Sequence, residues 1–297
     1  MYQHLYLRGN FQQDMFFDKV DMINVWNRLW LSAYATGILI LSAVILNNHF
    51  HITCIFHDED QRTRFKRHFR LSITQYHNRR YQVKGTLGTR TLKHADLKDK
   101  EDLKDCICYH IRNVLHHGIT NNYLDYPYST ARYAFDLATE NQQGFYTSKT
   151  LPDNLARAYL PAREKLQKGW MMTREGLIVP PTTVFRADIV EKIFDGTRED
   201  YLEALTHRTT REAGDTGPED GFHTDANDSR LYDEQLSEFV KENCRIPIPS
   251  MSEGQKMEAI YQILEQFPKA NRRLLSRLFG IPPTTLDYRI KSSYKRK

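Results

Sequence analysis

The sequence has few cysteines, no repeated segment and no long apolar run. The cysteines form no CxxC pair and show no zinc-ligand spacing, so we expect reduced thiols at Cys54, Cys106, Cys108 and Cys244. The most apolar run, residues 38–46, is roughly half as long as a membrane-spanning helix, and the first residues lack the pattern of a signal peptide. We therefore expect a cytoplasmic protein without a membrane partner.

Motifs for small-molecule chemistry are also missing. The chain has neither a glycine-rich phosphate loop nor a carboxylate-rich metal site, which argues against a phosphotransfer enzyme or metal hydrolase acting on small molecules. Charge of one sign is not in large excess, because 42 basic residues face 37 acidic ones and the net charge is +5. Such a total says little about partners, so the distribution of charge along the chain is more informative.

Residues 1–140 alternate strand and helix patterns. Asn47 and Asn48 predict a hairpin turn, and Gly118 is expected to end a helix. This alternation predicts an α+β fold in which helices cover one face of a sheet. The strand patterns cover 2–8, 38–46, 49–56 and 86–93, and the helix patterns cover 14–34, 58–80 and 99–117.

Residues 141–250 predict a helical middle region with an acidic, polar linker. Helices are expected at 155–168 and 184–194, and residues 208–229 have the composition of a loop. Within 195–245, acidic residues outnumber basic ones by 14 to 6, so this segment is not expected to lie along DNA.

Residues 251–297 predict a compact unit of three helices. The expected helices cover 253–267, with Ser252 as N-cap, then 270–279, and then a third from Pro283. The segment LLSRLFGIPPTTLDYRIK has the layout of a helix-turn-helix, and a helical docking domain with a basic tail is the alternative. The side chains expected to contact DNA are Arg272, Arg273, Thr284, Thr285, Tyr288 and Arg289.

Two pairs of residues could carry chemistry. His49 and His51 alternate on a predicted strand, so both imidazoles point to one face and could share a metal ion. Tyr109 and Asn113 lie one turn apart on a predicted helix, where an amide oxygen could complete a hard-metal site and a phenol could attack a phosphate. Taken singly, each pair has an ordinary interpretation, namely solvent-facing histidines and a tyrosine used for packing.

A basic segment without any acidic residue runs from residue 62 to 90. Aromatic residues are interleaved with its charges, which favours contact with phosphates and unpaired bases over a merely solvated helix face. The basic residues are Arg62, Arg64, Lys66, Arg67, Arg70, Arg79, Arg80, Lys84 and Arg90.

The ordered set of motifs in the N-terminal half resembles the HUH-type tyrosine transposases, in particular the REP-associated branch. HLYLRGN with FFDKVDM resembles the family's opening strand and helix, and LNNHFHI resembles its histidine strand. QYHNRRYQVKGTLGTR is similar to its basic helix, CYHIRNVLHHGI to its tyrosine helix, and DYPYSTARY to its closing segment. The sequence departs from the family pattern in having Val114 after the asparagine and Asn47-Asn48 before the first histidine.

This resemblance implies a ferredoxin-like antiparallel sheet and a single-strand DNA endonuclease and strand transferase. It implies Mg²⁺ or Mn²⁺ bound by His49, His51 and Asn113, and attack by Tyr109 to form a 5′-phosphotyrosine bond. Tyr76 and Tyr81 are the other candidate nucleophiles. The implied substrate is single-stranded DNA with hairpins or palindromic repeats, and the implied location is the nucleoid.

The resemblance leaves several alternatives open. The chain could act as a monomer or a homodimer, and it could be a DNA-binding protein derived from a transposase that no longer cuts. The implied division is a nuclease/transposase domain at 1–140, a middle region at 141–250 and a DNA-binding domain at 251–297.

Overall fold

The structure is a computed structural model. It describes residues 1–9, 13–89, 91–116, 119–135, 137, 144–207, 239, 246–268, 270 and 272–294. Within these ranges, no helix combines the length and the apolar character needed to cross a bilayer.

The fold is α+β and is built on a four-stranded antiparallel sheet with the strand order β2-β3-β1-β4. The strands are β1 (Tyr2–Arg8), β2 (Leu39–Ile45), β3 (His49–Ile55) and β4 (Lys93–Leu97). The first three occupy the predicted positions. The fourth was wrongly predicted at 86–93, because the chain turns there through Gly85 and Gly88, both with positive φ. A Cβ on Gly88 would lie 2.6 Å from the carbonyl oxygen of Arg8, so the close approach also requires glycine.

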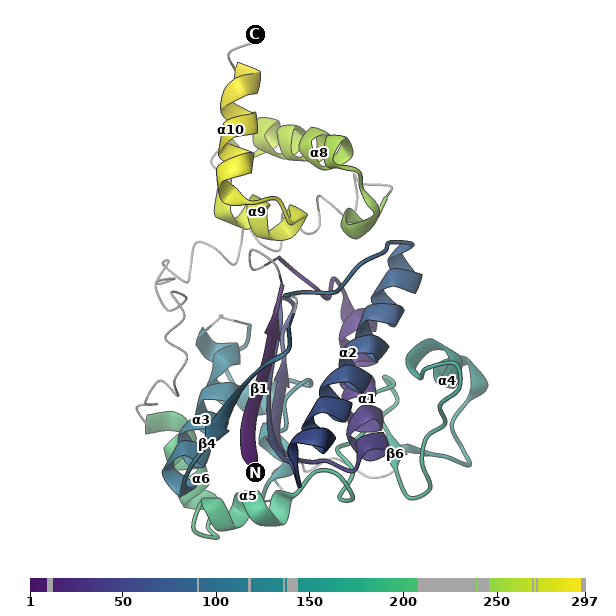
Figure 1. Ribbon diagram of the computed structural model, residues 1–297, viewed down its shortest axis with the longest axis vertical. Coiled ribbons are helices and arrows are strands. Elements are labelled where there is room, and N and C mark those ends of the chain that lie inside the picture. Colours follow the sequence, from purple (N-terminus) through teal and green to yellow (C-terminus); the bar gives the residue numbers. More distant parts are fainter. Residues whose placement is uncertain are drawn as a thin grey trace.

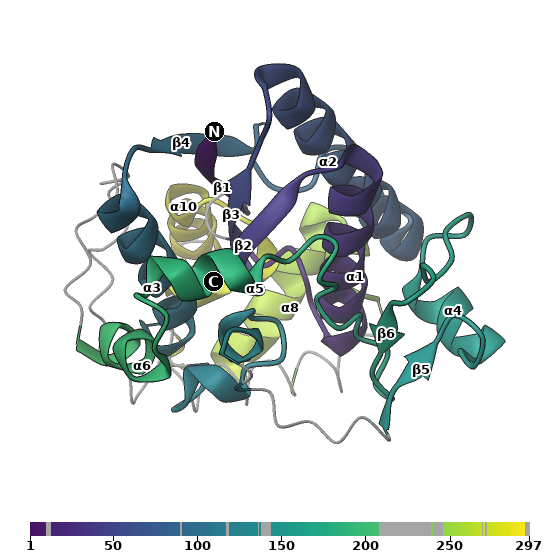
Figure 2. The same cartoon turned by 90° about the horizontal axis from the view of Figure 1, so that it is seen from below.

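Two long helices, α1 (Lys19–Thr36) and α2 (Glu59–Tyr81), cover one face of the sheet. Asp18 and Asp58 cap them by accepting hydrogen bonds from backbone N–H groups in the first turn. Their aromatic side chains join those of the sheet in one core, where Phe50 of β3 lies 5.3 Å from Phe69 of α2 between ring centroids. Figures 1 and 2 show both helices on the same side.

A third helix, α3 (Lys100–His116), lies against the opposite face, so the prediction of helices on one face only is wrong. Ser42 of β2 and Thr53 of β3 contact His110 of α3, whereas Phe50 points to α2. Because side chains alternate along a strand, Phe50 and Thr53 must face opposite sides. Gly118, expected to end this helix, lies outside the described residues.

Residues 144–207 pack onto the same sheet and helices. They form β5 (Tyr146–Thr147), α4 (Asp153–Tyr159), β6 (Met171–Met172), α5 (Ala187–Ile193) and α6 (Arg198–His207). Trp26 of α1 donates its indole N–H to the carbonyl of Ile178, and Asp195, between α5 and α6, bonds to Lys100 and Lys104 of α3.

The helix expected at 155–168 ends at Tyr159, so that prediction was wrong beyond this residue. Leu160 adopts an extended conformation before Pro161, as the residue before a proline tends to do. The helix expected at 184–194 corresponds to α5, and the predicted linker at 208–229 lies outside the described residues.

The C-terminal segment forms α8 (Glu253–Gln266), α9 (Arg272–Phe279) and α10 (Pro283–Tyr294) around a shared apolar core. Ser252 and Gln255 make a reciprocal capping box at the start of α8, and Gly280, with a φ of 63°, follows α9. Short 3₁₀ turns lie at Tyr123–Asp125, Ala131–Tyr133 and Ile248–Ser250.

This three-helix unit sits at the end of the sheet where β1 ends and β3 begins (Figure 1). Ser250 donates to the carbonyl of Tyr81 at the end of α2, at 2.6 Å, and Arg277 pairs with Asp14 at 3.6 Å. We refer below to this end, which carries Arg8, Asn48 and the last turn of α2, as the upper end of the sheet.

Candidate active site

Strand β3 and helix α3 bring His49, His51, Tyr109 and Asn113 together at the upper end of the sheet. The Nε2 atom of His49 lies 2.9 Å from Oδ1 of Asn113. The ring of Tyr109 meets that of His51 edge-on, with 5.4 Å between centroids, and His51 lies 5.1 Å from His49 in the same way. The structure therefore places all four residues selected from the sequence in one cluster.

The local sequence explains this convergence. His49 and His51 alternate on β3 and share the face opposite the buried Phe50. Tyr109 and Asn113 are four residues apart on α3, so they lie on the same side of that helix, toward the sheet.

The site is open on one side. His51 and Asn113 are nearly buried, at 8% and 3% exposure, whereas His49 and Tyr109 are only half-buried. Part of His49 and of Tyr109 is therefore exposed to solvent, while His51 and Asn113 lie deeper.

Each histidine of β3 uses its Nδ1 atom for a contact inside the protein. Nδ1 of His49 lies 2.5 Å from Oδ1 of Asn48, and Nδ1 of His51 lies 2.9 Å from Nε2 of His4. Metal-binding histidines commonly anchor one ring nitrogen in this way and present the other to the ion. Metal binding by these two imidazoles would therefore use their Nε2 atoms.

The contact between His49 and Asn113 fits a cation site. If His49 donates its Nδ1 proton to Asn48, its Nε2 atom carries a lone pair that faces the acceptor Oδ1 of Asn113. Two acceptors at 2.9 Å need a proton or a cation between them. Adjacent ligands of an octahedral Mg²⁺, each about 2.1 Å from the ion, lie about 3 Å apart. The spacing of the His49 imidazole and the Asn113 amide oxygen thus fits two ligands of a divalent metal.

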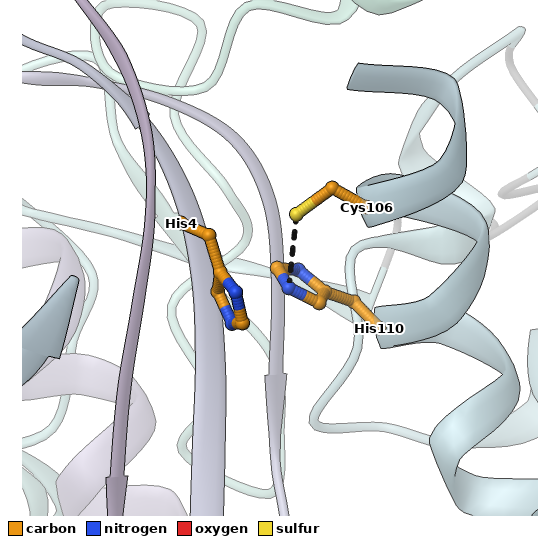
Figure 3. Close-up of side chains that lie close together, drawn as sticks. All are labelled: His4, Cys106 and His110. Atoms are coloured by element: carbon orange, nitrogen blue, oxygen red, sulfur yellow. Dashed lines mark hydrogen bonds between the residues drawn. The ribbon is translucent and has the colours of Figure 1, made fainter. Parts of the chain in front are cut away.

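A buried polar layer, which the sequence analysis missed, lies beneath this cluster. It contains His4 of β1 together with Cys106 and His110 of α3 (Figure 3), whose ligand atoms lie within 4.8 Å of one another. The group could hold a metal ion, and a thiolate with two imidazoles is a donor set that Zn²⁺ accepts.

Hydrogen bonds also account for this layer without an ion. Ser42 and Thr53 lie 3.0 and 3.2 Å from Nδ1 of His110, and the thiol of Cys106 lies 3.3 Å from its Nε2. Burial lowers the pKa of His110 well below its usual value, with a further contribution from His4, and burial raises the pKa of the Cys106 thiol to about 12. A neutral imidazole can therefore donate to the hydroxyls and accept from the thiol.

The signal for these residues was weak but present in the sequence. Cys106 and His110 are four residues apart on the helix that carries Tyr109, so they share a face with Asn113. His4 could be found only from the strand register, because it pairs with Thr53 and is thereby diagonal to His51.

Tyr76 and Tyr81, the other candidate nucleophiles, do not belong to this site. They lie on α2, on the opposite side of the sheet, and both donate to the buried carboxylate of Asp21, at 2.8 and 2.7 Å. Burial and this carboxylate raise the pKa of both phenols well above the usual value. Both tyrosines are therefore structural.

The guanidinium of Arg80 also forms hydrogen bonds within the protein. It donates to Asp18 and to Asp21, at distances between 2.5 and 2.9 Å. The guanidinium thus neutralises the buried acid of α1, and contact of Arg80 with DNA stays a prediction.

The other basic residues of the segment fall into two groups along α2. Arg62, Arg64, Lys66 and Arg67 lie in its first turns, at the lower end of the sheet, whereas Arg79 and Lys84 are exposed at the upper end. Among them, Arg62 pairs with Glu59 and Lys66 contacts His94, while Arg70 donates to the carbonyl of Thr89. Arg90 lies outside the described residues. The helix α2 and Tyr109 lie on opposite faces of the sheet. Of the two basic groups, only the one at the upper end lies near the end of the sheet that holds the site.

The C-terminal residues selected from the sequence are mostly at the surface. Tyr288 is 74% exposed on α10, Thr284 and Arg273 are exposed, and Thr285 is half-buried. Arg272 pairs with Asp287 at 2.9 Å, and Arg289 pairs with Glu253 at 2.7 Å. These two arginines brace the three-helix unit in addition to any contact with a partner.

No protein-family model and no curated protein matches the chain. Among solved structures, the chain is similar to one described as a REP-associated tyrosine transposase bound to a REP hairpin. The sequences are 15% identical and the TM-score is 0.38, over 47% of this chain and 81% of the other. Similarity at this level carries no argument about activity, so the case for function depends on the residues themselves.

Proposed function

We propose that the chain is a metal-dependent single-strand DNA endonuclease and strand transferase, a transposase, with Tyr109 as its nucleophile. The observation that carries this proposal is the convergence of a half-buried tyrosine with His49, His51 and Asn113 on one face of the sheet. A packing tyrosine would need no such neighbours, and solvent-facing histidines would not be anchored through Nδ1.

The proposal includes the fold and the family. A β-α-β-β-α-β order with the sheet order β2-β3-β1-β4 supports a ferredoxin-like domain, to which α3 adds the tyrosine. Together with the motifs of the sequence, this supports placement among the HUH-type tyrosine transposases and a site of action at the nucleoid.

Nε2 of His49, Nε2 of His51 and Oδ1 of Asn113 would hold the metal. When bound, Mg²⁺ or Mn²⁺ supplies Lewis-acid polarisation of the phosphate that is cut. Asn48 and His4 contact the Nδ1 atoms of the two imidazoles, and Asn113 is buried beside them. The protein thus prepares the arrangement before DNA arrives.

The phenol oxygen of Tyr109 then attacks the phosphorus of the DNA backbone. The new bond joins tyrosine to the 5′ phosphate, the bond from phosphorus to the 3′ oxygen breaks, and the phenol proton passes to solvent while the 3′ oxygen gains one. Rejoining is the reverse reaction with another 3′ hydroxyl, and it needs no ATP because the phosphodiester energy is kept in the tyrosine bond.

The upper end of the sheet offers a surface for DNA on both sides of the site. Arg79 lies in the last turn of α2 and Lys84 follows the helix, and the helix-turn-helix-like unit of α9 and α10 presents Thr284 and Tyr288 beyond it. We assign to these elements the single strand and its adjoining hairpin, because basic groups bind phosphates and exposed aromatic rings stack on bases.

The test is incubation of the full chain with labelled, hairpin-bearing single-stranded oligonucleotides and Mg²⁺ or Mn²⁺. A covalent protein–DNA adduct that forms with the wild type and with Tyr34→Phe, but not with Tyr109→Phe or with a chelator, supports the proposal. Tyr34 is a suitable control because it is 48% exposed on α1, on the other side of the sheet.

Two results would contradict the assignment. An adduct that persists in Tyr109→Phe places the nucleophile elsewhere. Tight binding without any adduct, over a broad set of oligonucleotides, favours a DNA-binding protein that has lost catalysis.

A further inference from the structure

We propose that His4 is a positioning residue that sets the tautomer and the orientation of His51, so that Nε2 of His51 faces the candidate metal site. This inference rests on the proposed function in treating His51 as a metal ligand. It concerns a residue of β1 that lies far from the HxH pair in sequence and does not touch the substrate side of the site.

The geometry points to this role through one direct bond. Nε2 of His4 lies 2.9 Å from Nδ1 of His51, and both side chains are nearly buried, at 3% and 8% exposure. The two rings are also stacked, with centroids 5.1 Å apart. The strand register holds them together, because Tyr6 pairs with His51 and His4 is the next residue on the same face of β1.

The ring of His4 is itself fixed from the other side. It packs on His110 with 4.5 Å between centroids, and His110 is held by the hydroxyls of Ser42 and Thr53 and by the thiol of Cys106. His4 thus packs on a buried ring of α3 that is itself held by residues of β2, β3 and α3.

The 2.9 Å contact fits donation by either ring, and the proposed role requires His51 to be the donor. A neutral imidazole that offers the Nε2 lone pair must carry its proton on Nδ1, and His51 can then donate that proton to Nε2 of His4. A neutral imidazole in water prefers the opposite tautomer, with the proton on Nε2. Without an acceptor at Nδ1, His51 would therefore present a proton instead of a lone pair to the metal site.

The buried hydroxyl of Ser42 provides a matched control. Its hydrogen bonds reach Thr53 and His110, at 2.9 and 3.0 Å. Ser42→Ala therefore perturbs the same buried layer without removing the acceptor of His51. Any loss of stability that it shares with a His4 variant measures the cost of disturbing the layer, and not the role of His4.

The experiment compares the full-length wild type with His4→Leu, His4→Gln and Ser42→Ala. Nitrogen-15 spectra of labelled histidines, with the His51 signals assigned from a His51→Ala sample, report the tautomer without metal. Electron paramagnetic resonance of added Mn²⁺ then measures metal affinity. We expect the Nδ1–H form of His51 in the wild type, in His4→Gln, whose amide oxygen can accept the proton, and in Ser42→Ala.

In His4→Leu we expect the Nε2–H form or a mixture, and Mn²⁺ affinity reduced by about 10- to 100-fold. Retention of the Nδ1–H form in His4→Leu would overturn the proposal, and so would equal losses of affinity in His4→Leu and Ser42→Ala. A wild type that shows the expected tautomer but binds no Mn²⁺ leaves the role of His4 supported and removes the metal-dependent function instead.

Discussion

Replacing Asp21 tests whether Tyr76, Arg80 and Tyr81 of α2 stabilise the fold. Asp21 is 1% exposed, and its carboxylate accepts four hydrogen bonds. The donors are the backbone N–H of Phe17, the phenols of Tyr76 and Tyr81, and the guanidinium of Arg80. Asp21→Asn keeps the volume but removes the charge and replaces one acceptor by a donor.

The expected cost is large because the partners stay buried. A hydrogen bond to a charged group contributes about 1.5–3 kcal/mol, but four bonds to one carboxylate do not add. Breaking a buried ion pair by removing one partner costs about 3–5 kcal/mol. Arg80 keeps its bonds to Asp18, so we expect the lower part of this range, about 3 kcal/mol.

Equilibrium unfolding in urea measures this effect, with the fluorescence of the buried Trp26 and Trp30 as the signal. Asp18→Asn is the matched control, because Asp18 also binds Arg80 but its side chain is 39% exposed and mainly caps α1. Asparagine caps helices about as well as aspartate, so Asp18→Asn loses mainly the partly exposed ion pair with Arg80 and should cost at most about 1 kcal/mol. A loss below 1 kcal/mol for Asp21→Asn would refute the assignment of Tyr76, Arg80 and Tyr81 to the fold.

Two further predictions concern the site and its DNA surface. The thiol of Cys106, whose pKa burial raises to about 12, should resist a thiol reagent at pH 8 until the protein unfolds, since roughly one thiol in 10⁴ is ionised there. Fast labelling of the native protein would contradict the raised pKa of this thiol. Because the unfolded thiol ionises near pH 9, the stability that the raised pKa contributes is present below pH 9 and is lost as the pH rises toward 12. The double variant Arg79→Ala/Lys84→Ala should lower the salt slope of single-strand binding by about 1.4, as measured by fluorescence anisotropy. Arg64→Ala/Arg67→Ala should leave the slope nearly unchanged, because Arg64 lies about 22 Å from Arg79 along the helix. Equal effects of the two double variants would refute the inference that only the upper basic group contacts DNA.

Periodicity and turn chemistry predicted most of the N-terminal elements. The alternation in β3 and the helical spacing of α2 are local signals, and both elements lie within a residue of the predicted bounds, whereas α1 begins at Lys19 and not at residue 14 because Asp18 caps it. The errors came from backbone constraints with longer reach. Pro161 stops the helix that apolar spacing alone would extend, and the close approach of Gly88 to Arg8 delays the fourth strand.

The side of the sheet that α3 covers was not predictable from local pattern. A helix with one apolar face packs equally well on either side, and the choice is made by contacts between residues distant in sequence, such as Ser42 with His110. The roles of Arg80 and Tyr76 were missed for the same reason. Their charge and aromaticity are visible in the sequence, but the carboxylate of Asp21 that uses them is not.

The position of β1 has a consequence for how the protein is made. This strand is the first element of the chain, yet it lies inside the sheet between β3 and β4, and it supplies His4. During synthesis it must remain unpaired until both partners have been translated, and two long loops must close before either pairing stabilises it. A nascent chain therefore holds no complete site until Asn113 has also been translated. If the protein cuts DNA as proposed, a nascent chain that ends before Asn113 cannot cut it.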